Sequence, residues 1–299
     1  GSARAGGFVG GTYATLKFTS CTNSGNVTSS VSSTSDTGKT VAAGFVGDSE
    51  SGVPNVTFTA ADEANGIKPC KNTGTITITG NLNQYARVSG FSNLDHTSGT
   101  LTGHDLINEG QIVAKNMKGV GYIQIGGVTA CHIKGSKWIN ATNKGSILVE
   151  NVECSYIIAG GISGHSADGS IAEGKIVNVG DITVKDCKFS TPASVRVGGL
   201  VASPYVAIAD AECHCTILAE GLGGHVGMIF GGERATKYPV KAKVGGAVAV
   251  ERDPEDESWK KKALTEENYF NYLYSAGEAT DWTGTDNYDG CTFLSAKPN

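Results

Sequence analysis

The stretch "CTNSGNVT" (residues 21–28) decides the fold, because the chain repeats its pattern. Asn-x-Gly-x-(Ile/Val) returns in "CKNTGTIT" from residue 70, "LINEGQIV" from 106, "ATNKGSIL" from 141 and "IVNVGDIT" from 176. The Asn residues lie at positions 23, 72, 108, 143 and 178, so successive differences are 49, 36, 35 and 35. A repeated period of about 20 to 50 residues indicates a solenoid, a propeller or another array.

A second motif alternates with the first. It reads Gly-Phe-Val-Gly at Gly7 and Gly44, and looser copies begin at positions 90, 127, 161 and 199. With one longer interval, from Gly44 to Asn72, about 16 to 21 residues separate each motif from the next, too few for a propeller blade of about 40 to 45 residues. The spacing therefore favours a parallel β-helix with about 18 residues per coil and two coils per repeat.

The local chemistry of the motif agrees with a β-helix. "TGTITITG" (residues 73–80) alternates Thr and Ile, which is typical of a strand with one buried face. Gly tolerates backbone angles that few other residues adopt, and Asn bonds nearby backbone groups in turns. We therefore interpret Asn-x-Gly as a corner. We expect Asn72, Asn108, Asn143 and Asn178 to stack along one line, two coils or roughly 9–10 Å apart.

Composition excludes several classes of protein. The 299 residues carry a formal net charge of −5 and only 18% charged residues, which argues against the basic surface that nucleic-acid binding needs. No apolar run reaches the roughly 20 residues of a transmembrane helix. Glycine is abundant, with 42 residues against an average share of about 7%.

Alternation of "GGFVG" (residues 6–10) with "NSGNVT" or "NTGTIT" resembles the GLUG-type repeat of bacterial surface and secreted proteins. The resemblance covers roughly residues 6–220. The C-terminal "NYDGCTFLSAKP" is similar to the ends of surface proteins of gut Bacteroides. What the resemblance implies is export to the cell surface or medium and an adhesin-like role, with no catalytic residues to carry over.

We expect a β-solenoid domain over residues 1–250 with about six repeats, and a C-terminal cap over residues 251–299. Thr265 is placed to N-cap a short amphipathic helix in the cap, because Glu266 and Glu267 follow it in the first turn, and Ala276-Gly277 would end this helix. A solenoid needs its ends covered, and no N-terminal cap precedes the first motif. We therefore expect a leader or further domains upstream of Gly1.

Candidate reactive groups favour no particular chemistry. Strand alternation separates His214 from Cys213 and Cys215, which is poor geometry for one metal, so we expect buried thiols there. Cys21 and Cys70 each precede a motif Asn by two residues, and we expect buried thiols at equivalent corners. We interpret the few carboxylates of the repeats as solvent-exposed charges in loops. We expect no catalytic residues, no metal and no cofactor.

The strands that lead into the second motif carry the most informative pattern. Residues 85–90, 122–127, 156–161 and 194–199 read "YARVSG", "YIQIGG", "YIIAGG" and "SVRVGG". The positions four and two residues before the Gly are apolar each time and should face the core. The intervening positions should face outward together. The predicted binding residues are Tyr85, Arg87, Tyr122, Gln124, Tyr156 and Arg196.

Two interpretations of this row remain open. Aromatic rings stack on sugars and planar polar groups bind hydroxyls, which indicates a platform for a polysaccharide or a cell-surface glycan. Tyrosine is also simply a good strand residue, and the row then only covers its neighbours. The function we favour is a non-catalytic, cell-surface or secreted module for adhesion or glycan binding. The alternatives are a polysaccharide-degrading lyase or glycosidase on a β-helix and a passive spacer. The oligomeric state is open.

Overall fold

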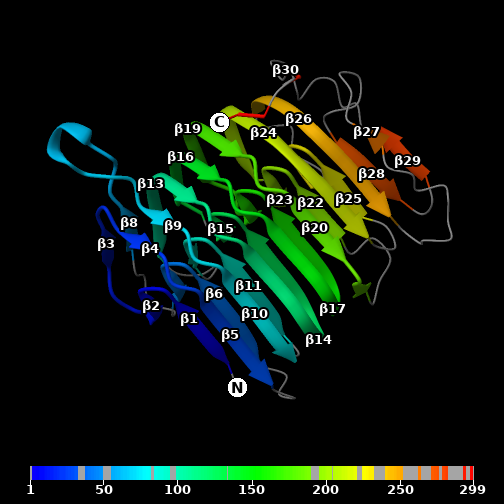
Figure 1. Ribbon diagram of the computed structural model, residues 1–299, viewed down its shortest axis with the longest axis horizontal. Coiled ribbons are helices and arrows are strands. Elements are labelled where there is room, and N and C mark those ends of the chain that lie inside the picture. Colours follow the sequence, from blue (N-terminus) through cyan, green and yellow to red (C-terminus); the bar gives the residue numbers. More distant parts are fainter. Residues whose placement is uncertain are drawn as a thin grey trace.

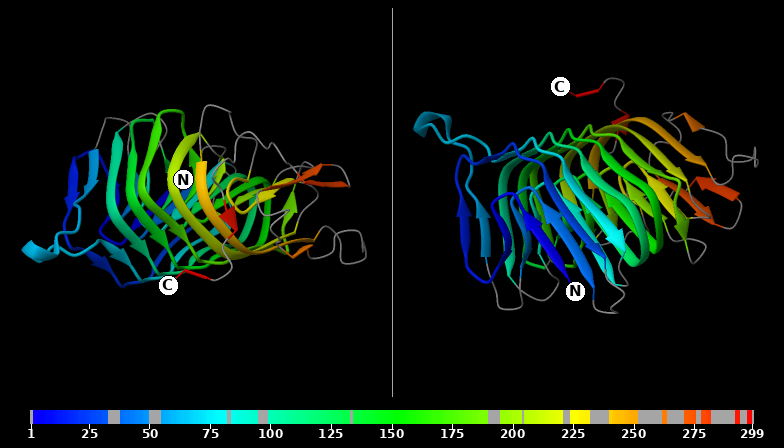
Figure 2. Two further views of the ribbon diagram at one scale, coloured as in Figure 1. Left: turned by 90° about the horizontal axis from the view of Figure 1, so that it is seen from above. Right: turned by 60° about the horizontal axis from the view of Figure 1, so that its bottom comes forward.

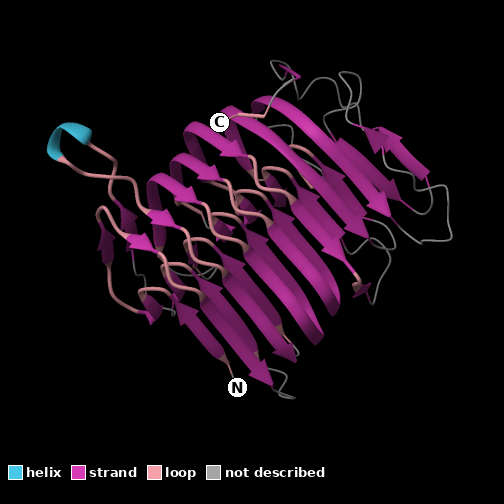
Figure 3. Cartoon of the chain, in the orientation of Figure 1, coloured by secondary structure: helices cyan, strands magenta, loops and turns pink. Residues whose placement is uncertain are grey.

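The protein is a parallel β-solenoid, seen here in a computed structural model (Figure 1). About 70% of the chain is strand, and loops and turns connect the strands (Figure 3). The structure describes residues 2–32, 38–49, 55–81, 84–94, 99–132, 134–189, 195–203, 205–220, 224–231, 240–251, 262–263, 271–275, 278–281, 292–293 and 297–298. The predicted all-β solenoid is therefore confirmed, and it makes about five turns.

Two sheets form the solenoid. The strands of the larger sheet, in chain order through the repeats, are β1 (Ala3–Gly6), β3 (Leu16–Phe18), β4 (Thr22–Asn23), β5 (Val27–Ser32), β6 (Lys39–Ala43), β8 (Asn55–Phe58), β9 (Lys71–Asn72), β10 (Ile76–Asn81), β11 (Tyr85–Ser89), β13 (Thr100–Asn108), β14 (Ile112–Gly126), β16 (Lys137–Asn143), β17 (Ile147–Gly160), β19 (Ser170–Asn178), β20 (Ile182–Lys185), β21 (Lys188–Phe189), β22 (Val195–Gly198), β24 (Val206–Glu220), β25 (Gly224–Gly227) and β26 (Val240–Glu251). The smaller sheet contains β2 (Val9–Thr12), β7 (Val46–Ser49), β12 (Ser92–Asn93), β15 (Thr129–His132), β18 (Ser163–Ser166) and β23 (Val201–Ser203).

Each repeat of about 35 residues is one coil. Parallel pairing joins β13 to β16 and β16 to β19, and its register places Asn108 beside Asn143 and Asn143 beside Asn178. The neighbouring strands lie side by side along the solenoid in every view (Figure 2). The predicted two coils per repeat are therefore wrong. The two motifs mark two places on one large coil, and their spacing had suggested two small coils.

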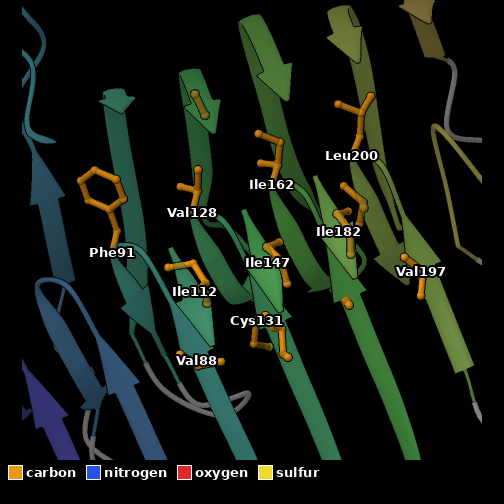
Figure 4. Packing of buried hydrophobic residues seen from close by; sticks show 14 of the residues in the cluster. Val88, Phe91, Ile112, Val128, Cys131, Ile147, Ile162, Ile182, Val197 and Leu200 are labelled. Atoms are coloured by element: carbon orange, nitrogen blue, oxygen red, sulfur yellow. The ribbon is translucent and has the colours of Figure 1, made fainter. Parts of the chain in front are cut away.

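The predicted strand phase is correct where the structure describes it. Ile76 and Ile78 are fully buried, and so are Ile123 and Ile125 on β14. At the apolar inward positions of the coil, side chains from successive coils lie in a row, as Figure 4 shows for Phe91, Val128, Ile162 and Leu200. The period-2 pattern thus builds a continuous core in which each coil packs on the next.

The motif asparagines form a ladder inside the solenoid, here called the Asn ladder (Asn23, Asn72, Asn108, Asn143 and Asn178). Each Nδ2 donates to the Oδ1 of the next Asn, over 2.7, 2.7, 2.7 and 2.8 Å along the series. Each Nδ2 also donates to the carbonyl of the Gly two residues on. The predicted line of Asn residues is confirmed, but the predicted spacing of 9–10 Å is wrong because adjacent coils hydrogen-bond directly.

The second motif packs against this ladder. A Cβ on Gly127 would lie 2.3 Å from Cγ of Asn143 and 2.2 Å from the carbonyl oxygen of Gly161. The same relation recurs between Gly90 and Asn108, so the motif Gly leaves room for both the amide and the next coil. The two motifs of the sequence are therefore two sides of one internal contact.

The remaining corners use residues with left-handed backbone. Asp105 and Asn140 have φ of 51° and 58°, and Asn140 Nδ2 donates to Asp105 Oδ1 at 2.9 Å. Asn116 and Asn151 both have φ of 53°, and Asn151 Nδ2 donates to Asn116 Oδ1 at 2.8 Å. Short polar side chains that tolerate this conformation thus turn each coil at equivalent places.

The described part of the C-terminal region is made of strands: β27 (Lys262–Ala263), β28 (Asn271–Ser275), β29 (Glu278–Asp281) and β30 (Thr292–Phe293). β28 pairs antiparallel with β25 and β29. The predicted helix is wrong over Asn271–Ser275, where sheet pairing overrides the amphipathic pattern, and Thr265 lies outside the described residues.

Candidate functional site

Three tyrosines form a stack on the outer face of the larger sheet, here called the Tyr ladder (Tyr85, Tyr122 and Tyr156). β11, β14 and β17 are adjacent and in register, so the three side chains lie at one position of successive coils. The ring centroids of Tyr85 and Tyr122, and of Tyr122 and Tyr156, are each 5.3 Å apart with 14° between planes. The predicted row exists, but its spacing is one coil and its rings stack on one another.

This stacking decides which parts of the rings are open. Tyr85 and Tyr122 are half-buried, and Tyr156 is 38% exposed. A gap of 5.3 Å leaves no space for a sugar ring between two tyrosines. The ladder therefore presents ring edges and hydroxyl groups, and Tyr156 presents the most surface.

The polar residues predicted beside the tyrosines divide into two groups. Arg87 and Gln124 are buried, with exposed fractions of 1% and 4%, and Arg87 Nε donates to Gln124 Oε1 at 2.7 Å. The Arg87 guanidinium carbon lies 4.5 Å from the centroid of Tyr85, in cation–π geometry. These two residues lie beside the Tyr ladder on the same face, and Arg87 contacts the ring of Tyr85. Arg196 is exposed on β22 and is open to a ligand.

The hydroxyl groups of Tyr122 and Tyr156 stay protonated at neutral pH. Burial raises the pKa of Tyr122, and it also raises the pKa of Tyr156 although Arg196 and Arg87 lie nearby. A neutral phenol both donates and accepts a hydrogen bond. Tyr122 and Tyr156 therefore present neutral hydroxyls beside the cation of Arg196.

An ion cluster continues the same outer face, and sequence reasoning missed it. Lys39 pairs with Tyr85 in the register, and its Nζ lies 5.7 Å from the centroid of the Tyr85 ring. Lys39 Nζ and Arg4 Nε contact Oδ2 of the fully buried Asp48 at 2.8 and 2.9 Å. A signal existed, since Lys39 precedes Gly44 by five residues, as Tyr85 precedes Gly90.

The cysteines and the long interval between Gly44 and Asn72 form no further candidate site. Cys213 and Cys215 are buried with their sulfur atoms 3.9 Å apart, as predicted. Cys70 is a buried thiol, whereas Cys21 is only half-buried. Among the described residues, no group of three or more His, Cys, Asp or Glu is arranged to hold a metal ion. Of the long interval between Gly44 and Asn72, residues 55–58 form the ordinary coil strand β8, and Glu63–Asn65 form a 3-10 turn at the solenoid edge (Figure 3).

Comparison with protein-family models, with curated proteins and with solved structures finds no match to this chain. In the described residues, no helix has the length and apolar character needed to cross a membrane.

Proposed function

We propose that this chain is a non-catalytic module of the bacterial cell surface or the secreted fraction, and that it binds an extended polysaccharide along the Tyr ladder. The observation that carries the proposal is the in-register row of Tyr85, Tyr122 and Tyr156 on one outer face. The surface location rests on the resemblance of the repeat to GLUG-type sequences.

The ladder suits a polymer better than a single sugar. Its hydroxyls recur once per coil, a repeat comparable with one pyranose residue in an extended chain. Each contact is a hydrogen bond worth about 0.5–1.5 kcal/mol net, so one sugar alone would bind weakly. Once one sugar of a glycan chain is bound, the next sugars meet the next hydroxyls of the ladder at a high effective concentration, so the contacts strengthen binding together. Affinity should therefore rise steeply with oligosaccharide length.

The mode of binding differs from the face-on platform that the sequence suggests. Since the rings cover each other, the glycan lies across the ring edges and exchanges hydrogen bonds with the phenols. Arg196, which follows Tyr156 on the neighbouring coil, adds a charged donor for sugar hydroxyls or uronic carboxylates. Arg87 and Gln124 hold Tyr85 in place without touching the ligand.

A glycan array on the purified chain, followed by calorimetry with oligosaccharides of increasing length, tests the proposal. Tyr156→Phe removes only a hydroxyl and should weaken binding about threefold to tenfold, the equivalent of one hydrogen bond. Tyr156→Ala should weaken it further, with little change in melting temperature because the ring is partly exposed. Tyr13→Ala is the matched control, since Tyr13 is 68% exposed and lies outside the ladder.

The alternatives give different results in the same experiment. A spacer binds no glycan on the array. A lyase or glycosidase shortens the oligosaccharides, which mass spectrometry of the calorimetry samples detects. Equal binding by Tyr156→Ala and the unsubstituted chain would place the glycan site elsewhere.

A further inference from the structure

Arg196 is an exposed cation at one end of the Tyr ladder. Parallel pairing of β22 with β17 sets Arg196 beside Ile158, which follows Tyr156 by two residues and therefore shares its face of the sheet. Burial raises the pKa of Tyr156, and the positive charge of Arg196 is the largest effect in the opposite direction, so the guanidinium lies within electrostatic reach of the phenol. Within the described part of the chain, no carboxylate forms an ion pair with Arg196. Its charge is therefore available to a ligand.

The other cations of this face already have partners inside the protein. Lys39 Nζ and Arg4 Nε both contact Oδ2 of Asp48, which is fully buried. Arg87 is buried and donates from Nε to Gln124 Oε1. The neighbouring strands β6, β11, β14, β17 and β22 thus carry, in this order, an ion-paired lysine, three tyrosines and an exposed arginine. At one end of the row a buried carboxylate holds the cations, and at the other end the cation faces solvent.

The strands of the row contain nothing that repels an anion. Residues 85–89, 122–126, 156–160 and 195–198 include no Asp or Glu, although the whole chain has a formal net charge of −5. The carboxylate that comes before Tyr156 along β17 belongs to Glu153, and it lies beside Lys188 in the register. The Arg196 end is thus a local site of positive charge on an acidic protein.

We propose that the polysaccharide bound by the Tyr ladder is acidic, and that Arg196 holds the carboxylate of one uronic acid residue while Tyr156 and Tyr122 exchange hydrogen bonds with the hydroxyls of the sugars next to it. This inference rests on the proposed function and adds the substrate class. A guanidinium matches a carboxylate through two parallel N–H···O bonds, and charge-assisted bonds are roughly twice as strong as neutral ones. A neutral glycan would leave the cation without this partner.

The geometry sets where along the glycan the charge is needed. The rings of Tyr122 and Tyr156 are 5.3 Å apart, and β22 is the strand that follows β17 in the same direction. The sugar beside Arg196 is therefore the direct neighbour of the sugar at Tyr156. Since the exposed cation lies at one end of the row alone, it also fixes the direction in which the glycan lies.

Matched acidic and neutral oligosaccharides test the inference. Calorimetry on the whole chain compares oligogalacturonate and oligomannuronate with the same oligosaccharides after methyl esterification, which removes the charge and keeps the sugar and its linkage. The esters should bind about tenfold more weakly, the equivalent of one charge-assisted hydrogen bond. The difference should shrink as salt is added, because salt screens exposed charges.

Substitution of two exposed cations assigns the effect to its residue. Arg196→Gln should bind acid and ester equally, and Arg196→Lys should fall between, because an ammonium lacks the planar fork of a guanidinium. Lys17→Gln is the matched control, since Lys17 is exposed on β3, which pairs with β8 and not with a strand of the ladder. It changes the net charge by the same amount and should keep the full preference for the acid. The comparison of acid with ester on the unsubstituted chain does not depend on how the variants fold.

The outcomes separate this inference from the proposed function. Equal binding of acids and esters, or an unchanged preference in Arg196→Gln, would overturn the inference and leave the ladder as a site for neutral glycans. An equal loss of preference in Lys17→Gln would show a general attraction between charges and would overturn it as well. Binding of sulfated oligosaccharides without binding of either uronate would contradict the assigned carboxylate. No binding of any glycan on the array would overturn the proposed function too.

Discussion

The side chain of Asn143 occupies the space into which a Cβ on Gly127 would project, with Cγ of Asn143 2.3 Å from that position. The two residues belong to different motifs and lie 16 positions apart in the chain (143 − 127). This contact explains why the chain repeats both motifs with one period. An amide inside the solenoid needs a neighbour without a side chain, and the coil supplies one at every turn.

Replacing Gly127 by alanine should destabilise the protein by about 2–3 kcal/mol or more, because the new methyl group meets backbone and a buried amide. Urea unfolding followed by circular dichroism measures the change. Gly25→Ala is the control, since its added Cβ would have no neighbour nearer than 3.8 Å. Equal losses in the two variants would mean that the close contact at Gly127 relaxes without cost.

Breaking the Asn ladder in its middle should cost about 2–4 kcal/mol. Asn108→Leu keeps the number of side-chain heavy atoms and the branch at Cγ but leaves an unpaired donor on Asn72 and an unpaired acceptor on Asn143, each costing about 1–3 kcal/mol. The exposed pair Asn116 and Asn151 provides a control, because Asn151→Gly keeps the left-handed backbone accessible and should change stability by about 0.5 kcal/mol or less. A stable Asn108→Leu protein would show that the ladder specifies register without stabilising it.

Acid should weaken the fold through His132. This residue is buried and its ring stacks on Trp138 at 3.6 Å between centroids. Burial lowers its pKa from 6.5 to about 3. The unfolded chain therefore binds one more proton than the folded chain between pH 6.5 and pH 3. Stability from this group is complete above pH 6.5 and falls by about 1.4 kcal/mol per pH unit below it.

Chemical denaturation at a series of pH values measures this slope. His132→Phe keeps an aromatic ring against Trp138 and should remove the His132 contribution below pH 6.5. Identical slopes for His132→Phe and the unsubstituted chain would show that another group carries the acid response.

The thiols should react in an order set by burial. Burial, with a smaller contribution from the neighbouring Cys187, raises the pKa of Cys154 to about 12, so Cys154 has almost no thiolate at pH 8. Cys187 and Cys21 are half-buried. Alkylation of the folded protein at pH 8, read peptide by peptide by mass spectrometry, should modify Cys21 and Cys187 well before Cys154. Equal rates at Cys154 and Cys187 would show that the solenoid opens there on the timescale of the reaction.

Much of this architecture follows from the sequence. The alternation around Tyr122 predicts that Ile123 and Ile125 face inward and the tyrosine outward, and the structure agrees. That inference depends only on strand geometry, which gives every second side chain the same face. The equal spacing of the Asn residues likewise predicts that they align.

The residues next to the tyrosines show the limit of this reasoning. Arg87 and Gln124 point outward as the alternation requires, yet both are buried. Alternation assigns a side chain to a face of a sheet, but burial depends on what covers that face. Arg196, at the equivalent position on a later coil, remains exposed.

The sequence by itself determined the β-solenoid class, the repeat of about 35 residues and the inward and outward faces of its strands, because these depend on local periodicity. Only the tertiary structure decided how many coils a repeat makes, since a spacing of 16 to 21 residues between motifs fits either a whole small coil or part of a large one. Pairing between residues 35 apart selects the large coil, and it brings Asn143 against Gly127. It also sets the tyrosine rings 5.3 Å apart, stacked on each other, so only their edges and hydroxyls are left for a ligand.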